Sequence, residues 1–333
     1  MPQGKVAIGV FSDIISQIIQ EREYMKISII GLGSVGSAVA TAVRNTGFVH
    51  EMVLFDRDAV RARAAAEDLG HAASFGFDVK ITAANNYRVI RGSDIVIIAA
   101  GANQKAGETR TDLLMKNADV IRDIIPRVMA NVDAKHVKII MVTNPLDVMV
   151  MLAQKLSKLP SARVIGTGTM LDSARLRTIL SRQLSVSTQS VNAYVLGEHG
   201  DSSVVAWSSA CIGAIDLDYF CKQIKIPLTA AARATISHRV RNAAYEIIQG
   251  RGATWDGIGA AVADLLRCII NDERRIVTVS AVAGTGSNAV AMSLPRIVGA
   301  AGVIATVMPK LDKTEAASLR KSAKIIRRNY DEL

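Results

Sequence analysis

The chain has 333 residues, of which 50% are hydrophobic and 21% charged, a composition typical of a soluble globular protein with room for two cores. The longest apolar runs, such as residues 95–100, are far shorter than the roughly 20 residues of a membrane helix. The amino terminus has no secretory design, so we expect a cytoplasmic protein. The three cysteines (Cys211, Cys221 and Cys268) form no CxxC pair and no metal-ligand spacing, which favours reduced thiols over a redox or metal site.

The net charge of +10 would suit a nucleic-acid binder, because basic surfaces attract phosphate. The basic residues are dispersed, however, and only 4% of the residues are aromatic, too few for a platform that stacks bases. The composition therefore favours a cationic enzyme that attracts anionic substrates, with no nucleic-acid partner.

Residues 1–24 stand apart from the rest of the chain. Apolar residues at helical spacing (Phe11, Ile14, Ile15, Ile18 and Ile19) are followed by a charged stretch, which predicts one apolar helical face. Two interpretations remain open: the segment is an extension left by an upstream start codon or by cloning, or it is an arm that packs on another subunit.

From Lys26 onward, short apolar runs alternate with helix-length segments, which predicts an α/β fold with a doubly wound parallel sheet. The predicted strands, most of them rich in Val and Ile as expected for buried parallel strands, are 26–30, 52–55, 79–83, 94–100, 138–143 and 163–166. After about residue 170 the segments become longer and helical, with a strand-like stretch at 191–196. We therefore predict a Rossmann domain at 25–168 and a second, α+β substrate domain at 169–333, with 1–24 as an N-terminal extension.

A glycine-rich turn follows the first predicted strand. Gly31, Gly33 and Gly36 form a GxGxxG pattern between this strand and the helical stretch 37–44, the context that a dinucleotide-binding turn requires. The first glycine permits the tight turn, the second lets the backbone approach a pyrophosphate at the helix N-terminus, and the third lets helix and strand pack closely. Asp56 ends the next strand, where a carboxylate accepts hydrogen bonds from ribose hydroxyls and repels a 2′-phosphate. The pattern therefore predicts NAD rather than NADP.

Two further segments lie at predicted strand ends, the edge at which a doubly wound sheet binds its ligands. The loop 101–110, GANQKAGETR, has glycines that would let it close over a substrate and exclude water. Arg110 at its end could polarise a ketone oxygen as negative charge develops. Asn144, in the stretch TNPLD, carries an amide that can donate and accept hydrogen bonds near a cofactor ring.

Acid–base chemistry is predicted by two later motifs, GTGTMLDSAR and GEHGDS. Asp172 and Arg175 are three residues apart and would project from one face of a helix. Arg175 could grip a carboxylate with two parallel hydrogen bonds, although an intrahelical salt bridge with Asp172 is the alternative. His199 lies between glycines in a predicted turn, and histidine is suited to proton donation in hydride transfer to a ketone. A carboxylate on its other ring nitrogen would fix the tautomer, and Asp172 is the candidate.

In this order along the chain, these five motifs resemble the L-lactate and L-malate dehydrogenase family from Lys26 to the carboxyl terminus. The resemblance implies that His199 donates and accepts the proton, that Asp172 orients it, that Arg110 polarises the carbonyl and that Arg175 binds the substrate carboxylate. It implies NAD as the cofactor and a homotetramer as the assembly. The cofactor contacts that glycine spacing and resemblance together predict are Gly31, Gly33, Val35, Gly36, Asp56, Arg61, Tyr87, Gly101, Ala102 and Asn144.

Within this resemblance, Gln104 predicts lactate rather than malate as the substrate. Malate and oxaloacetate carry a second carboxylate that calls for a positive charge, whereas the methyl group of lactate or pyruvate favours a neutral residue. Gln104 lies at the discriminating position, where malate enzymes would have arginine, although a shift of one residue would place Lys105 there. Thr254 matches a threonine of the lactate-type pocket and, with Asn144, completes the predicted substrate contacts. Asp256, an unexpected carboxylate in the same stretch, has to point away from an anionic substrate.

The expected activity is therefore reversible hydride transfer between NADH and pyruvate, closest to the bacterial-type enzymes, with malate or another L-2-hydroxyacid as the alternative. Arg177 matches an arginine through which many bacterial relatives bind fructose 1,6-bisphosphate, but Asn192 replaces the histidine of that site, so we expect no such activation. A non-enzymatic NAD-binding subunit would not need His199, Arg110 and Arg175 together. A metal-dependent hydrolase is disfavoured because the histidines are far apart and no HExxH occurs, so we predict no metal.

Overall fold

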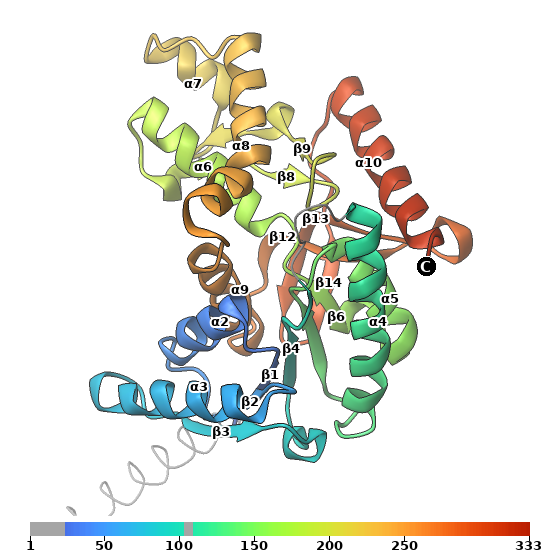
Figure 1. Ribbon diagram of the computed structural model, residues 1–333. Helices are drawn as coiled ribbons and strands as arrows, with labels where there is room; N and C mark the ends of the chain where they lie inside the picture. The colour runs from blue at the N-terminus through green and yellow to red at the C-terminus, as the bar shows by residue number, and fades with distance from the viewer. Residues whose placement is uncertain (1–23, 103–108) are drawn as a thin grey trace, which may run out of the picture.

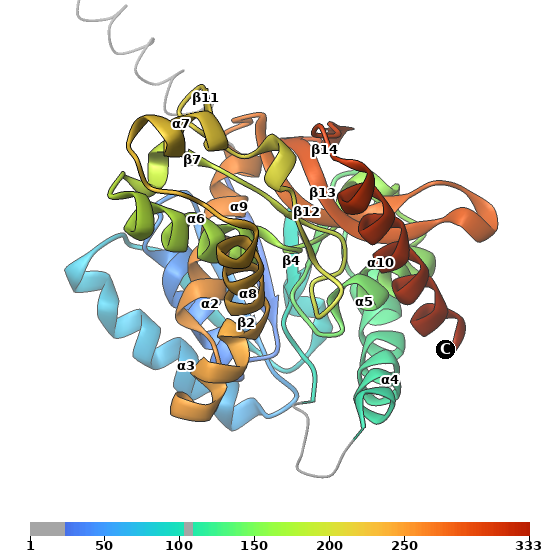
Figure 2. The ribbon, with the colours of Figure 1, turned by 90° about the horizontal axis from the view of Figure 1, so that it is seen from above.

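The structure, a computed structural model, describes residues 24–102 and 109–333. Its main sheet runs through the middle of the molecule with helices on both faces (Figures 1 and 2). The strands of this sheet are β1 (Lys26–Ile30), β2 (Glu51–Phe55), β3 (Lys80–Ala84), β4 (Ile95–Ile98), β5 (Lys138–Met141), β6 (Val164–Gly166), β12 (Arg275–Ala283), β13 (Val290–Gly299) and β14 (Gly302–Thr306). In the described residues they lie in the order β14-β13-β12-β6-β5-β4-β1-β2-β3.

Six strands form a doubly wound parallel sheet. The neighbours β3, β2, β1, β4, β5 and β6 are all paired in parallel, and the strand order reverses between β1 and β4, where such sheets bind ligands. The predicted fold class is therefore confirmed, and each of the six predicted strands is present with ends within two residues of the expected ones.

The other three strands extend the same sheet and were not predicted. β12 pairs antiparallel with β6 through Ser280 and Gly166, and β13 and β14 follow as antiparallel neighbours. The second part of the chain thus covers the open edge of the parallel sheet at β6, which would otherwise expose unpaired backbone groups.

Helices cover both faces of the sheet and form a separate layer above it in Figure 1. They are α2 (Ser34–Arg44), α3 (Ala59–His71), α4 (Arg110–Met129), α5 (Leu146–Ser157), α6 (Met170–Leu184), α7 (Leu217–Gln223), α8 (Ala230–Arg251), α9 (Asp256–Ile270) and α10 (Lys313–Asp331). Five short strands lie between α6 and α7 in the described residues: β7 (Val191–Asn192), β8 (Val195–Leu196), β9 (Val204–Val205), β10 (Cys211–Ile212) and β11 (Ile215–Asp216). β7 and β8 fall within the strand-like stretch predicted at 191–196.

The sheet separates two hydrophobic cores. Along β2, Met52 and Leu54 belong to the core beneath α2 and α9, whereas Val53 and Phe55 belong to the core beneath α4 and α5. This alternation follows from the two-residue period of a strand, and it explains why buried parallel strands are apolar along their whole length. A third core joins α6 and α8 with the short strands.

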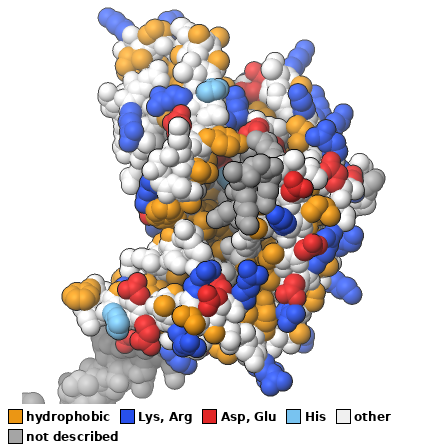
Figure 3. Space-filling model, in the orientation of Figure 1, with side chains coloured by type: hydrophobic (Ala, Val, Ile, Leu, Met, Phe, Trp, Pro, Cys, Tyr) orange, Lys and Arg blue, Asp and Glu red, His pale blue; other side chains and the backbone are white. Residues whose placement is uncertain are grey.

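In the described part of the chain, no helix is long and apolar enough to cross a membrane. Lysine and arginine side chains are spread over several elements in Figure 3, with a concentration over α10 at the upper right. This helix exposes Arg320, Lys321, Lys324 and Arg328, so the basic residues that are dispersed in the sequence gather locally on the surface.

Candidate active site

The three glycines of the GxGxxG turn have distinct steric surroundings. Gly31 has a φ of +94°, and a Cβ atom there would lie 2.5 Å from the backbone of Ala100. A Cβ on Gly36 would lie 1.8 Å from the carbonyl oxygen of Gly31, whereas a Cβ on Gly33 would meet nothing within 4 Å. Only the middle glycine therefore borders open space, as a close approach by pyrophosphate requires.

The N-terminus of α2 is suited to a phosphate. Gly33 is its N-cap residue, and no side chain caps the helix. The backbone N–H groups of the first turn are therefore available to donate hydrogen bonds to a ligand. Val35, a predicted cofactor contact, lies in this first turn and packs partly against the core beneath α2.

Asp56 follows β2 and closes the adenosine side of the predicted cofactor site. Asp56 is 6% exposed, and its carboxylate accepts hydrogen bonds from the backbone N–H groups of Leu32 (2.8 Å) and Asp58 (3.0 Å). Arg61 Nη1, on α3, lies 3.8 Å from Asp56 Oδ2. The acid thus holds the glycine-rich turn in place, and a carboxylate at this position could accept hydrogen bonds from a ribose.

Tyr87 packs against Phe55 at the end of β2, with 4.3 Å between the ring centroids. Burial and the nearby Asp123 raise the pKa of Tyr87 to about 12, so its hydroxyl stays protonated at any physiological pH. It can therefore serve a ligand as a neutral hydrogen-bonding group or as an apolar surface.

Asn117 on α4 joins two strand-end segments of the site, and sequence reasoning missed it. Its Oδ1 accepts a hydrogen bond from the Ala102 N–H (2.7 Å), and its Nδ2 donates to the carbonyl oxygens of Asn144 (2.7 Å) and Ala102 (3.3 Å). Thr143 Oγ1 adds a bond to the Ala100 carbonyl at 2.7 Å. The one available signal was that helical spacing places a polar Asn117 on the same face as buried Leu114 and Ile121.

His199, Asp172 and Arg175 form a connected ionic group. His199 Nδ1 lies 2.7 Å from Asp172 Oδ2, and Arg175 Nη1 lies 2.8 Å from Asp172 Oδ1. The intrahelical salt bridge considered for the pair on α6 is therefore present, and the same carboxylate also contacts the histidine. Because a carboxylate accepts the Nδ1 hydrogen, Nε2 is left to exchange a proton with a ligand.

Electrostatics favour the charged forms of this pair. Burial by itself raises the pKa of the Asp172 carboxyl, but His199 and Arg175 outweigh burial and lower this pKa below its usual value. Burial also opposes a charge on His199, but Asp172 and Asp147 outweigh burial and raise the pKa of His199 above its usual value. His199 keeps 26% of its side-chain surface exposed, so the ring remains accessible as a proton donor.

The loop that carries His199 is fixed by backbone contacts from several elements. Gly197 exchanges two hydrogen bonds with Ser293 of β13 (2.9 and 2.8 Å), and the Glu198 N–H donates to Ser322 Oγ of α10 at 2.8 Å. The His199 N–H donates to Asp147 Oδ2 at 2.7 Å. Asp147 belongs to the motif TNPLD, but its contact with His199 was not anticipated.

Gln104 and Lys105 lie outside the described residues, as does the side chain of Arg110. The backbone of Arg110 begins α4, directly after a capping box in which Thr109 Oγ1 accepts a hydrogen bond from the Asp112 N–H at 3.1 Å and Asp112 accepts one from the Thr109 N–H at 2.9 Å. A capping box fixes the start of a helix.

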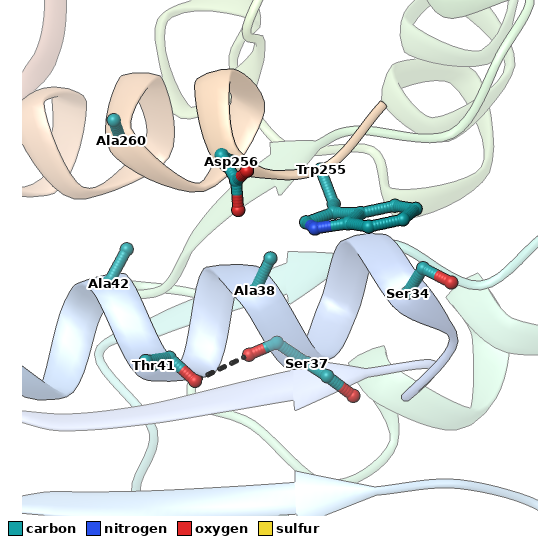
Figure 4. Close-up of a pocket in the computed structure, with 8 residues that line it drawn as sticks. All are labelled: Ser34, Ser37, Ala38, Thr41, Ala42, Trp255, Asp256 and Ala260. Atoms are coloured by element: carbon teal, nitrogen blue, oxygen red, sulfur yellow. Dashed lines mark hydrogen bonds between the residues drawn. The ribbon is translucent and has the colours of Figure 1, made fainter. Parts of the chain in front are cut away.

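Thr254 is half-buried between α8 and α9, close in the chain to the unexpected Asp256. A groove of about 490 Å³ lies between α2 and α9, bordered by Trp255 and Asp256 on one side and by Ser34 and Thr41 on the other (Figure 4). Arg251 Nη1 lies 2.7 Å from Asp256 Oδ2, and its guanidinium carbon lies 4.2 Å from the centroid of the Trp255 ring. The extra carboxylate is therefore compensated by a local cation.

Arg177 and Asn192, the two positions considered for a sugar-phosphate site, make contacts within the chain. Arg177 Nε donates to the Ala193 carbonyl at 3.2 Å, and its guanidinium lies over the Tyr194 ring. Burial lowers the pKa of Arg177. Asn192 Nδ2 donates to the Gly213 carbonyl at 3.0 Å. Within residues 24–102 and 109–333, no group of three or more His, Cys, Asp or Glu side chains could hold a metal ion.

Two comparisons identify relatives by sequence. Residues 25–166 match the NAD-binding domain of the lactate/malate dehydrogenase family, and residues 169–333 match its alpha/beta C-terminal domain. The chain is 46% identical to an L-lactate dehydrogenase of Thermus aquaticus and 45% identical to one of Allorhizobium ampelinum, each over 305 residues that cover 91% of this chain and 97% of the relative.

Solved structures agree with the sequence relatives. The minor L-lactate dehydrogenase of Enterococcus mundtii, in a ligand-bound form, superposes with a TM-score of 0.88 at 33% identity over 93% of this chain and 98% of that chain. A lactate dehydrogenase from a deep-sea metagenome library of the Medee basin superposes with a TM-score of 0.87 at 37% identity, with the same coverage.

Proposed function

Because the chain belongs to the lactate/malate dehydrogenase family, we propose that it is an NAD-dependent L-lactate dehydrogenase that interconverts pyruvate and L-lactate. The observation that carries this proposal is the contact of His199 Nδ1 with Asp172 Oδ2 at 2.7 Å, with Arg175 on the second oxygen of the same carboxylate. This arrangement provides a proton donor and a guanidinium side by side, as reduction of a 2-oxo acid requires.

The proposed cofactor residues divide into three groups. Gly31, Gly33, Val35 and Gly36 would hold the pyrophosphate at the N-terminus of α2. Asp56 and Arg61 would contact the ribose, and Tyr87 would line the adenosine side. Gly101, Ala102 and Asn144 would contact the nicotinamide half. When NAD is bound in this way, it supplies or accepts the hydride.

The protein's own groups handle the proton and the substrate charges. In reduction, protonated His199 gives the Nε2 proton to the ketone oxygen, and in oxidation the neutral ring takes it from the hydroxyl. Asp172 holds the tautomer and stabilises the charged ring. Arg175 binds the substrate carboxylate with the guanidinium donors that Asp172 leaves free, and Arg110 stabilises the charge that develops on the oxygen. Gln104, Asn144 and Thr254 complete the substrate contacts.

The finer points of the proposal are a preference for pyruvate over oxaloacetate, a cytoplasmic location, a homotetrameric assembly and a role in glycolysis and pyruvate fermentation. Residues 25–168 would form the cofactor domain and 169–333 the substrate domain, preceded by the extension 1–24. Gln104 is neutral, which suits a substrate with a methyl group rather than a second carboxylate and so supports the pyruvate preference.

Steady-state NADH oxidation tests this substrate assignment. We expect a higher kcat/KM for pyruvate than for oxaloacetate, and we expect Gln104→Arg to shift the ratio toward oxaloacetate. Lys105→Gln is the matched control, and it should leave the ratio unchanged. A wild-type preference for oxaloacetate would move the proposal to malate dehydrogenase, and a change of ratio in Lys105→Gln alone would move selection to Lys105.

The role of His199 is tested by separating turnover from cofactor binding. His199→Ala should abolish turnover while NADH still binds, because the ring acts on the proton and not on the dinucleotide. His136 is a matched control, since its Nδ1 also lies 2.7 Å from a carboxylate, that of Asp133, but on the surface. His136→Ala should retain full activity, and loss of NADH binding in His199→Ala would contradict the assigned role.

A further inference from the structure

Asp147 is a buried carboxylate next to His199 that the mechanism above leaves without a task. It lies in the first turn of α5 and is 3% exposed. Its Oδ2 accepts the hydrogen bond from the His199 N–H (2.7 Å), and its Oδ1 accepts one from Ser280 Oγ of β12 (2.5 Å). Among the described residues, no lysine or arginine forms an ion pair with it.

Holding the His199 backbone does not by itself require a charge. The loop is already attached through Gly197 to Ser293 and through Glu198 to Ser322, and a neutral carbonyl oxygen could accept the His199 N–H equally well. An ionised carboxylate without a cation in contact is costly in a buried position. A charged Asp147 therefore has to gain from some other group.

The imidazole ring of His199 is one group that favours a charge on Asp147. Among residues 24–102 and 109–333, three charged or titratable groups interact electrostatically with Asp147: His199, Glu198 beside it on the same loop, and Arg296 on β13. The Arg296 guanidinium donates to backbone carbonyls such as those of Ala281 and Met292 (both 2.8 Å). Glu198 opposes the charge on Asp147, whereas His199 and Arg296 favour it. Reciprocally, the charge on Asp147 favours the protonated His199 ring, in addition to that of Asp172.

We propose that Asp147 is a positioning residue that fixes the His199 backbone and whose negative charge favours the protonated ring. This inference rests on the proposed function, in which the protonated ring is the proton donor. Burial raises the pKa of Asp147 to about 6, so the carboxylate is charged at neutral pH and loses its charge in mild acid. The favourable effect on His199 therefore disappears as the pH falls through this range.

NMR titration of the histidine rings tests the charge without any assay of turnover. The chain has five histidines, so ¹³Cε1-labelled rings give few signals, and His199→Asn identifies the one of interest. In Asp147→Asn, which keeps a carbonyl oxygen for the His199 N–H, the titration midpoint of His199 should fall by several tenths of a pH unit. Glu198→Gln is the matched control, because it removes the charge of the carboxylate directly before His199 in the chain. Oε2 of Glu198 accepts a hydrogen bond from Ser202 Oγ, and this substitution should leave the titration midpoint of His199 unchanged.

The pH dependence of pyruvate reduction gives a second readout. In Asp147→Asn, the fall of kcat/KM with rising pH should begin at lower pH by the same amount, while the KM for NADH stays unchanged. A merely structural role would lower the rate at every pH without moving the midpoint. An unmoved His199 midpoint in both measurements would overturn the proposal.

Two further outcomes remain informative. A shifted NMR midpoint in a protein that does not reduce pyruvate would retain the electrostatic link and refute the proposed function instead. If Asp147→Asn does not fold, Ser280→Ala replaces it. Loss of the hydroxyl that stabilises the carboxylate should let Asp147 take up its proton at higher pH, so the His199 midpoint should fall in the same direction but less. An unchanged midpoint in Ser280→Ala would then count against the proposal.

Discussion

Two alanine substitutions in the GxGxxG turn should separate folding from cofactor binding. In Gly36→Ala, the new Cβ would lie 1.8 Å from the Gly31 carbonyl oxygen, and Gly31 cannot retreat because it already packs against Ala100. Alanine gains about 1 kcal/mol over glycine inside a helix, but overpacking costs about 1–3 kcal/mol or more even where neighbours can shift. Because the contact is between two backbone segments, we expect an overpacking cost of about 3 kcal/mol, the upper end of this range. The free energy of unfolding should therefore fall by about 2 kcal/mol in total.

Gly33→Ala should behave in the opposite way. Its backbone (φ −71°, ψ −172°) is open to any L-residue, and its Cβ would meet nothing within 4 Å. Alanine lowers the entropy of the unfolded chain, which stabilises the fold by about 0.5–1 kcal/mol. It is also a weaker N-cap residue than glycine, which costs about 0.5–1 kcal/mol, so the two effects on the free energy of unfolding nearly cancel. The added methyl group would instead occupy space proposed for the pyrophosphate, so the Kd for NADH should rise at least about tenfold, which corresponds to about 1.4 kcal/mol.

Thermal unfolding without cofactor and fluorescence titration with NADH measure the two effects. Gly36→Ala should lower the Tm by about 4–8 °C, and Gly33→Ala should leave it within about 3 °C of the wild type. Normal NADH binding by Gly33→Ala would show that the pyrophosphate does not approach this glycine. An unchanged Tm in Gly36→Ala would refute the steric reasoning.

Three further predictions concern the groups that organise the site. Because only the protonated ring donates, kcat/KM for pyruvate reduction should fall as pH rises through the raised pKa of His199, and Asp172→Asn should move that fall to lower pH; a profile without such a fall would exclude His199 as the donor. Asn117→Ala removes the side-chain partner of the backbone groups of Ala102 and Asn144, two exposed residues, and should lower the free energy of unfolding in urea by about 1–2 kcal/mol, whereas a loss below about 0.5 kcal/mol would contradict its role in joining the two segments. The pKa of Asp147 is raised from 3.8 to about 6 in the folded protein. Above this folded pKa, ionisation of Asp147 therefore lowers the free energy of unfolding by up to about 3 kcal/mol, whereas below the unfolded pKa it has no effect. Asp147→Asn should therefore be more stable than the wild type at pH 7.5 but not at pH 4, and equal gains at both would contradict this linkage.

Local patterns sufficed to predict the parallel half of the sheet. Buried parallel strands are continuous apolar runs of fixed length, and a GxGxxG turn has to follow one of them, so the sequence from Lys26 to Gly36 already specifies β1, the turn and the start of α2. The spacing of Asp172 and Arg175 likewise specifies a contact on one helix, which the structure contains at 2.8 Å.

Contacts between segments that are distant in the sequence could not be predicted from local patterns. Ser280 bonds Asp147 across 133 positions of the chain, and neither residue has a neighbour in sequence that indicates the other. The strand β12 has a visible signal in the Val-rich run 275–283, but its partner β6 is known only once the sheet order is known. The contacts of Asn117 and Asp147 are therefore found only in three dimensions, although both residues lie in segments whose secondary structure is ordinary.

These long-range contacts explain how His199 is held in a fixed position relative to the parallel sheet. Ser280 pairs through its backbone with Gly166 where β12 joins the parallel sheet, and through its hydroxyl with the Asp147 carboxylate that holds His199. A Cβ on Gly166 would lie 2.6 Å from Val150 Cγ2 and 3.1 Å from Ser280 Cβ, so only glycine lets β6, α5 and β12 meet at this point. The position of His199 relative to the strand ends is thus fixed by the same junction that continues the sheet. Because a misplacement of about 1 Å can cost about a hundredfold in rate, a rigid junction there serves proton transfer as directly as the residues that touch the substrate.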